Sequence, residues 1–319
     1  MIIVAKDSSG THTSLQDAVN DAVPGDTIFI KNGIYTERVE IRTPQLTLCG
    51  ESEDGTILTG ARFALMPMPD IGKLGTFRTY TMLVDADNTV LRNFTVRNTA
   101  GCGPAIGQAI ALYADGNRLL CENLRLLGCQ DTLFTGPLPP QEIEKNGFIG
   151  PKQNSPRRPT RQVYRSCFIE GDIDFIFGSA DALFTDCTLF QKHRPFLPPA
   201  DTVSGNPVCS YAAAPSTPEG QHSGYVFDTC RFESDCPPHS CYLGRPWRNY
   251  AKLVILRSWL GAQICPEGFH NWNKPDAEKT VFFAEYKNSG PGADLQARPD
   301  WVHRLTDSEA AVFMTGKLF

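Results

Sequence analysis

The pattern of apolar and polar positions changes from a helical to a strand period shortly after the start of the chain. Apolar residues first recur at helical spacing: Leu15, Ala18, Val19, Ala22 and Val23. Thr13 or Ser14 is a candidate N-cap, and Pro24-Gly25-Asp26 ends this helix. A second short helix is predicted over Asp307–Phe313. Between the two helices the pattern predicts short strands.

Similar strand-like segments recur through the middle of the chain. Each alternates between buried and exposed character: Asn93–Arg97, Asn123–Leu127, Ser166–Glu170, Asp186–Phe190, Thr229–Glu233 and Arg257–Gly261. Their starts lie 30, 43, 20, 43 and 28 residues apart. These intervals fit one or two turns of a coil of about 20–30 residues, so the spacing predicts a solenoid with loop insertions.

A parallel β-helix is the all-β fold that this repeat favours. One turn cannot bury its own apolar face, whereas stacked turns share a core. The early helix would cap the N-terminal end and protect it from edge pairing. A β-sandwich, which also has regularly spaced short strands, is the alternative.

Two segments are predicted to be surface loops that project from the coil. Gly136–Thr160 is rich in Pro, Lys and Asn, and Pro195–Pro218 is rich in Pro, Ser and Ala. Both lie where one interval between repeats widens to two turns. No linker divides the chain, so we expect one domain over residues 1–319.

Composition limits the partners that the chain can have. Of the 319 residues, 41% are hydrophobic and 20% are charged, which is typical of a globular protein. A net charge of −5 disfavours a nucleic-acid partner. No apolar run reaches about 18 residues, so we expect no contact with a membrane through a spanning segment. A capped solenoid has no need of a partner chain, so we expect a monomer.

The cysteines and the start of the chain bear on cellular location. The odd count of 11 cysteines argues against a fully paired disulfide framework. Cys121, Cys167 and Cys187 lie in apolar runs, as small buried hydrophobic residues do. No CxxC pair occurs, so we expect no structural zinc, no other metal and no cofactor. Met1–Lys6 does not open a secretory signal, so we expect a cytoplasmic protein, or a secreted one if a leader was removed.

The most informative polar residues lie in Gly171–Gly178, where two aspartates alternate with large apolar residues. In a regular strand, Asp172 and Asp174 share one face, and Ile173 and Phe175 share the other. A carboxylate among such residues is costly unless it is paired or functional. The alternative is a structural aspartate that accepts hydrogen bonds from turn amides.

Three further clusters place polar side chains among apolar ones. Gln108 opens the stretch 107–112, Gln130 and Asp131 lie within 128–134, and Arg245 lies within 242–248. Taken singly, Gln108 fits a solvated strand start, and Arg245 fits a partner of a nearby acid. The six histidines lie outside the four clusters and no GxSxG motif occurs, so no Ser–His–Asp arrangement is apparent.

In this order, the four clusters resemble the signature motifs of the pectin methylesterase family. Gln108-Ala-Ile-Ala-Leu resembles QAVAL, Gln130-Asp-Thr-Leu-Phe resembles QDTLY, Asp174-Phe-Ile-Phe-Gly matches DFIFG, and Leu243-Gly-Arg-Pro-Trp matches LGRPW. The resemblance also covers residues 33–37 and 283–292, and so extends from about residue 10 to the C-terminus. Four ordered motifs are far more specific than any one of them.

The resemblance implies a right-handed parallel β-helix that removes methyl groups from esterified galacturonate. It implies that Asp174 is the nucleophile and that Asp131 is the general acid and later the general base. Gln108 and Gln130 would form the oxyanion site, and Arg245 would hold Asp174. The expected partner is methyl-esterified homogalacturonan or its oligogalacturonides.

A second set of residues is expected to contact the sugar: Gln108, Arg245, Trp247, Phe134, Phe177 and Thr76. For each aromatic residue alone, core packing is the alternative. Strand alternation places Phe175 and Phe177 on the face opposite Asp174, unless a local bend changes this. Thr76 matches a sugar-contacting threonine of the family only if a loop length differs.

Two carboxylates can hydrolyse an ester if one is ionised and the other is protonated. Two nearby like charges, together with partial burial, push their titrations apart. Arg245 would keep Asp174 ionised, and Asp131 would then retain its proton more readily. Amide side chains suit an oxyanion site because they donate hydrogen bonds without adding charge.

The chain departs from the family pattern at three places. Ser179 stands where the family usually has Asn after DFIFG, and Phe134 stands in place of the Tyr of QDTLY. The segment Gly101–Gly107 is longer than usual just before Gln108. These changes bear on subsite preference more than on the proposed acid and nucleophile.

Two other functions compete with the esterase. A pectin-active lyase would need clustered carboxylates for a metal, and a glycosidase needs paired acids, which Asp131 and Asp174 supply on composition alone. The paired glutamines favour acyl transfer, because an oxyanion needs neutral donors. A non-catalytic carbohydrate-binding protein is expected to have lost an acid or an oxyanion donor, and none is missing here.

Overall fold

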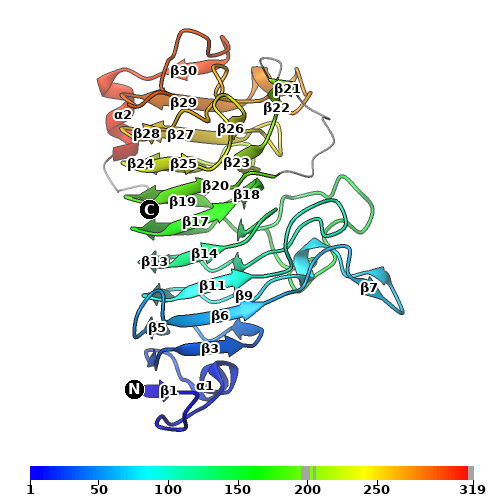
Figure 1. Ribbon diagram of the computed structural model, residues 1–319, viewed down its shortest axis with the longest axis vertical. Coiled ribbons are helices and arrows are strands. Elements are labelled where there is room, and N and C mark those ends of the chain that lie inside the picture. The colour runs from blue at the N-terminus through cyan, green and yellow to red at the C-terminus, as the bar shows by residue number, and fades with distance from the viewer. Residues whose placement is uncertain (195–201, 204–205, 315–319) are drawn as a thin grey trace.

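Three parallel β-sheets, whose strands stack one above another along the long axis, form the body of the computed structural model (Figure 1). The structure describes residues 1–194, 202–203 and 206–314. Sheet A contains β1 (Ile2–Val4), β2 (Thr27–Ile30), β5 (Thr47–Gly50), β10 (Val90–Arg92), β13 (Leu119–Glu122), β16 (Arg161–Arg165), β19 (Asp181–Thr185), β24 (Tyr225–Asp228), β27 (Lys252–Leu256), β29 (Phe282–Tyr286) and β30 (Val302–Arg304).

Sheets B and C complete each coil. Sheet B contains β3 (Gly33–Thr36), β6 (Thr56–Gly60), β11 (Thr95–Asn98), β14 (Arg125–Leu127), β17 (Phe168–Gly171), β20 (Thr188–Gln191), β25 (Arg231–Ser234) and β28 (Trp259–Leu260). Sheet C contains β4 (Val39–Ile41), β9 (Met82–Val84), β12 (Leu112–Ala114), β15 (Leu133–Thr135), β18 (Ile173–Gly178), β23 (Ser210–Pro215) and β26 (Cys241–Gly244).

The chain visits sheets A, B and C in turn, once per coil. The strands β13, β14 and β15 form one coil, and each pairs in parallel with its counterpart in the next coil, β16, β17 and β18. This is the predicted parallel β-helix. The β-sandwich alternative is wrong, because its sheets would be built from antiparallel strands.

The six repeats found in the sequence all become strands of sheet B. The first residue of each repeat has a φ between 48° and 60° and makes the corner between sheets A and B. The prediction of one or two turns per interval needs correction. The strands β14 and β17 are direct neighbours, as are β20 and β25, so even the intervals of 43 residues are single coils that carry insertions.

Both predicted short helices are present, α1 (Leu15–Asp21) at the N-terminal end of the stack and α2 (Asp307–Met314) along the side of sheet A (Figure 1). The helix α1 starts at Ser14, whose side chain accepts a hydrogen bond from the Asp17 backbone N–H. Its buried Leu15, Ala18 and Val19 join the central core at the N-terminal end (Figure 1). The helix α2 packs Ala310 against strands of sheet A. Among the described residues, no helix has the length and apolar character to cross a bilayer.

The remaining elements lie in the connections between strands. Two short antiparallel hairpins are formed by β7 (Pro67–Met68) with β8 (Gly72–Lys73), and by β21 (Thr202–Val203) with β22 (Asn206–Pro207). Single 3₁₀ turns are η1 (Thr76–Arg78) and η2 (Ala277–Lys279). All 11 cysteines are free thiols, and Cys121, Cys167 and Cys187 are buried as predicted.

The two predicted loops have different outcomes. Residues 136–160 contain no regular element between β15 and β16, as expected. In the second segment, 195–201 and 204–205 lie outside the described residues, but its later part includes β23, a buried strand of sheet C. The prediction of a loop as far as Pro218 is therefore wrong, because small residues at 212–214 fit inside the stack.

Candidate active site

Three successive coils present polar side chains at the corner where sheet B leads into sheet C. Gln108 precedes β12, Gln130 and Asp131 precede β15, and Asp174 lies in β18. The backbone N–H of Ala109 donates to Gln130 O at 3.0 Å, and that of Asp131 donates to the carbonyl of the residue before Asp174 at 3.0 Å. The stacked backbones thus bring together four predicted residues, which line one pocket of about 410 Å³.

Both aspartates sit on unusual backbone. The φ values of Asp131 and Asp174 are 64° and 48°, in the left-handed region that Asp adopts more readily than most residues. The pairing of β18 with β23 also shifts register between Ile173 and Ile176. This bulge turns the Asp174 carboxylate toward the pocket, and Asp172 is not among the residues that line it.

The bulge overturns the prediction from regular alternation. Phe177 lines the pocket together with Asp174, whereas Phe175 and Ile176 both lie in the central core. The expectation that Asp172 and Asp174 share a face is therefore wrong. The reason is the change of register inside the strand, which period-two counting does not include.

Arg245 holds Asp174 through both carboxylate oxygens. Its Nε donates to Oδ1 at 2.8 Å and its Nη2 donates to Oδ2 at 2.7 Å. The guanidinium carbon lies 3.8 Å from the ring centroids of Tyr211 and Trp272, so aromatic rings fix the position of the cation. A bidentate arginine stabilises the ionised form of a carboxyl group.

Asp131 has the opposite environment. Its carboxyl is buried, and burial raises its pKa well above the usual range. The negative charge of Asp174 raises the pKa further, and Arg245 only partly opposes this. Arg245 thus pairs with one aspartate, Asp174, whereas burial favours the carboxylic acid form of the other, Asp131.

Aromatic side chains form the floor and one wall of the pocket. Trp247 lies with its ring centroid 5.7 Å from that of Phe177 and 6.4 Å from that of Phe148. Thr76, Phe177 and Trp247 line the pocket, where the sequence had placed them. Phe134 does not, because it is fully buried behind Phe177, with ring centroids 4.9 Å apart. Its expected contact with the sugar is corrected to a packing role.

The pocket also contains cations that the sequence did not assign. Arg248 and Lys274 line it, and the Lys274 ammonium donates to the carbonyl oxygens of Pro246 and Trp247. Burial and the neighbouring charges of Arg248 and Arg245 lower the pKa of Lys274 to about 8. Lys274 lies outside the four motifs, so only its place in the fold reveals it.

The segment 136–160 supplies another wall of the pocket through Ile143, Glu144, Gly147 and Phe148. Lys152 ties this segment to the coils. Its ammonium forms an ion pair with Asp85 and lies 3.1 Å from Asp115 Oδ2. These acids follow β9 and β12, so the segment is fastened to the ends of two neighbouring strands.

Ser179, the departure that follows DFIFG, lies inside the coil. It is fully buried, and its hydroxyl lies 2.7 Å from the hydroxyl of Ser216 in the next coil. It is not among the residues that line the pocket. The change from Asn therefore alters packing between coils at this position.

The fold and the arrangement of the site define a class: a parallel β-helix protein with two buried aspartates and an arginine in one cleft. The family model described as Pectinesterase matches residues 1–137 and 157–319. The chain belongs to the pectinesterase family.

Individual relatives agree with this assignment. The chain is 31% identical over 328 residues to Pectinesterase 2 from Citrus sinensis, covering 99% of this chain and 56% of that protein. It spans between 51% and 60% of the length of the first four curated relatives.

Solved structures agree on the fold. Pectin methylesterase from carrot is 27% identical with a TM-score of 0.78, covering 97% of this chain and 89% of that chain. A pectin methylesterase in complex with hexasaccharide VII is 28% identical with a TM-score of 0.78, covering 99% and 96%. The family model leaves residues 138–156 unmatched, so one wall of the pocket is built largely by a segment outside the family match.

Proposed function

We propose that the protein hydrolyses the methyl ester of galacturonate residues in pectin or oligogalacturonides, releasing methanol. The observation that carries this proposal is the contrast between the two aspartates. Asp174 is bound through both oxygens by Arg245, whereas burial raises the pKa of Asp131 in the same pocket. Such a pair supplies a nucleophile and a proton donor, the two groups that ester cleavage needs.

In the first half of the reaction, a carboxylate oxygen of Asp174 attacks the C6 ester carbon. The carbonyl oxygen becomes negatively charged and accepts hydrogen bonds from the Gln108 and Gln130 amides. Removing one such donor typically raises the barrier by about 3 kcal/mol. The C6–O bond then breaks, methanol leaves with the proton of Asp131, and C6 remains bonded to Asp174 as an acyl-enzyme.

In the second half, the carboxylate of Asp131 takes a proton from water, and the resulting hydroxide attacks the acyl carbon. The C6–Asp174 bond breaks, Asp174 regains its charge, and galacturonate leaves as a free acid. Asp131 ends the cycle protonated, as it began. Arg245 holds Asp174 before the attack and again after the acyl group is released.

The pocket matches an acidic sugar chain in shape and in charge. Trp247 offers a half-buried aromatic surface for a sugar ring, and Arg248 and Lys274 offer positive charge to free carboxylates of neighbouring galacturonates. The relative solved with a hexasaccharide supports a saccharide ligand for this fold. We also propose action in the cytoplasm on imported oligogalacturonate esters, which detection of the native protein outside the cell would contradict.

The first test is methanol release from methyl-esterified oligogalacturonides by the parent protein and by Asp174→Asn. We expect release by the parent and loss of it in the variant, because an amide is a poor nucleophile. The matched control is Asp54→Asn, which changes an exposed aspartate and should keep full activity.

The products also separate the competing functions. New reducing ends would identify a glycosidase, and unsaturated ends would identify a lyase. Binding without any product would indicate a carbohydrate-binding protein. Equal methanol release by the parent and by Asp174→Asn would keep the esterase and reject the assigned nucleophile.

A further inference from the structure

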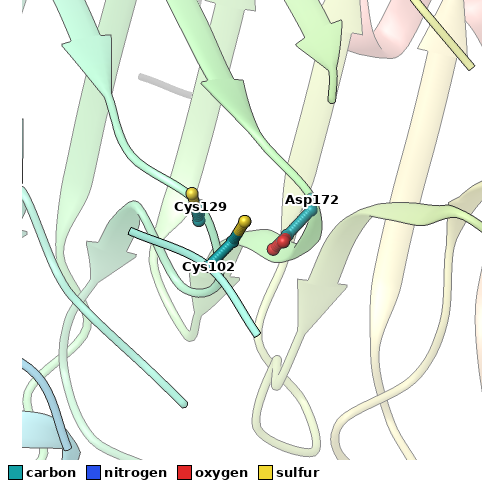
Figure 2. A group of neighbouring side chains, drawn as sticks. All are labelled: Cys102, Cys129 and Asp172. Carbon is teal, nitrogen blue, oxygen red and sulfur yellow. The ribbon is translucent and has the colours of Figure 1, made fainter. Parts of the chain in front are cut away.

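A second cluster of reactive side chains lies beside the active site and is not part of the pocket. It contains two thiols and one carboxylate, which Figure 2 shows side by side: Cys102, Cys129 and Asp172. Each comes from a different one of three successive coils, at the corner between sheets B and C. The coils are joined here, because the Asp172 backbone N–H donates to Cys129 O at 3.1 Å.

The candidate ligand atoms of this cluster lie close together. The two sulfurs and a carboxylate oxygen all lie within 4.8 Å of one another. In a tetrahedral zinc site with Zn–S bonds of about 2.3 Å, two sulfurs are about 3.8 Å apart. Cys102 can close the difference, since it lies between Gly101 and Gly103, whose φ values are 93° and 111° and whose surroundings are open.

Charge around the cluster suits a bound cation with thiolate ligands. Two thiolates, one carboxylate and Zn²⁺ together carry one negative charge, which nearby cations can compensate. Lys192 donates to Gly128 O at 3.1 Å, next to Cys129, and Arg194 Nε lies 3.7 Å from Asp172 Oδ2. That Arg194 Nε is buried and has no hydrogen-bond partner among the described residues. Such outer groups orient and tune metal ligands.

A metal ion can reach the cluster from solvent. Cys129 and Asp172 are buried, whereas Cys102 is partly exposed and lies on the irregular segment between β11 and β12. A metal could therefore enter from the side of Cys102 and be captured by the two buried ligands.

We propose that Cys102, Cys129 and Asp172 bind one Zn²⁺ ion, with water as the fourth ligand. The sequence predicted no metal, because it contains no CxxC pair, whereas these ligands lie 27 and 43 residues apart. The ion joins the segment that leads to Gln108 with the turns that carry Asp131 and Asp174. Its role is to fix these three coils relative to one another.

The test begins with protein that has been reduced and stripped of metal. Equilibrium dialysis against Zn²⁺ followed by elemental analysis should give one equivalent per chain, and Cd²⁺ should produce a thiolate charge-transfer absorption. Zn²⁺ should also raise the Tm. Cys102→Ser should lose the equivalent, the Cd²⁺ absorption and the Tm shift, while Cys49→Ser, which changes a partly buried thiol outside the cluster, should keep all three.

Asp172→Asn provides a second variant whose thiols are intact. We expect its Zn²⁺ affinity to fall by at least about tenfold, since even outer-shell changes cost that much. Failure of the parent to bind Zn²⁺, or equal binding by the parent and Cys102→Ser, would overturn the site. Formation of a stable Cys102–Cys129 disulfide in place of metal binding would overturn it as well. If Cys102→Ser did not fold, the Cd²⁺ absorption of the parent and the affinity of Asp172→Asn would decide.

Discussion

At the residue scale, two aspartates in one pocket acquire different chemistry from their neighbours. Asp174 is paired with Arg245 through two hydrogen bonds, and the nucleophilic role proposed for it requires a carboxylate. Asp131 is equally buried, and its burial raises its pKa, as does the negative charge of Asp174. Residue type alone therefore does not distinguish the proposed acid from the proposed nucleophile, whereas the position of one arginine does.

The first prediction separates catalysis from stability at Asp131. Asp131→Asn keeps the shape of the side chain but cannot transfer a proton, so methanol release should fall by about 10²–10⁴-fold. The same variant should be more stable than the parent near neutral pH. Burial raises the folded-state pKa of Asp131 above its unfolded value, so the stability linked to its proton is present at low pH and is lost as pH rises through the folded-state pKa.

Thermal unfolding at several pH values checks whether the stability linked to Asp131 falls as pH rises. The Tm advantage of Asp131→Asn should be largest above neutral pH and should shrink toward about pH 4, near the ordinary pKa of an aspartate. Asp54→Asn, at an exposed aspartate, should have no such advantage. A variant less stable than the parent at every pH would mean that Asp131 is not held in a protonated form.

Sequence motifs predicted the placement of most site residues but not all of their environments. Gln108, Gln130, Asp131, Asp174, Arg245, Trp247, Phe177 and Thr76 all line the pocket, as the resemblance implied. Phe134 was misplaced, because its motif position does not reveal that Phe177 covers it. Trp272 and Lys274 were missed, since they come from an irregular segment between β28 and η2 that only the fold brings to the pocket.

At the element scale, the corner residues explain why the repeat was visible in the sequence. Every repeat starts with a residue of positive φ between a strand of sheet A and a strand of sheet B. Asn and Asp favour this conformation, which accounts for Asn93, Asn123 and Asp186. The lengths of the insertions could not be predicted in this way, because loops project into solvent and their residues follow no period.

The second prediction concerns the segment 136–160, which forms one wall of the pocket. We expect the position of this wall to depend on Lys152. Lys152→Met leaves Asp85 and Asp115 facing each other without their shared cation. Removing one partner of a largely buried ion pair costs about 3 kcal/mol. Because burial already raises the pKa of Asp115 to about 6, we expect this acid to take up a proton at still higher pH in the variant.

The kinetic consequence should appear mainly in KM. Phe148 lies on the loosened segment, whereas Asp131 and Asp174 lie on the coils, so kcat should change much less than KM. Steady-state methanol release measures both constants. Lys145→Met, at an exposed lysine of the same segment, is the matched control and should leave both unchanged. An unaltered KM in Lys152→Met would mean that the segment does not shape the substrate site.

At the scale of the whole molecule, the stack of coils explains both the success and the limits of the sequence analysis. The solenoid could be predicted, because each coil repeats the same apolar positions and shares its core with its neighbours. The bulge in β18 and the cluster of Cys102, Cys129 and Asp172 could not, since both arise from the stacking of coils that are distant in sequence. The reactive side chains of the pocket and of this cluster thus lie where successive coils deviate from the repeat.

The third prediction follows from contacts that are limited to neighbouring coils. Leu15 of α1 is 1% exposed and packs at the N-terminal end of the core. Leu15→Ala should cost about 2–5 kcal/mol, and in a solenoid this loss should weaken mainly the first coils. Hydrogen exchange should become faster in β1, β2 and β5 and stay unchanged in β19 and β24. Methanol release should be retained, because Asp131 and Asp174 lie on coils that α1 does not contact. Val23→Ala, at a side chain that is 61% exposed, should alter neither exchange nor release. Faster exchange along the entire stack in Leu15→Ala would mean instead that the coils unfold as one cooperative unit, and the end helix would then stabilise the active site as well as the end that it covers.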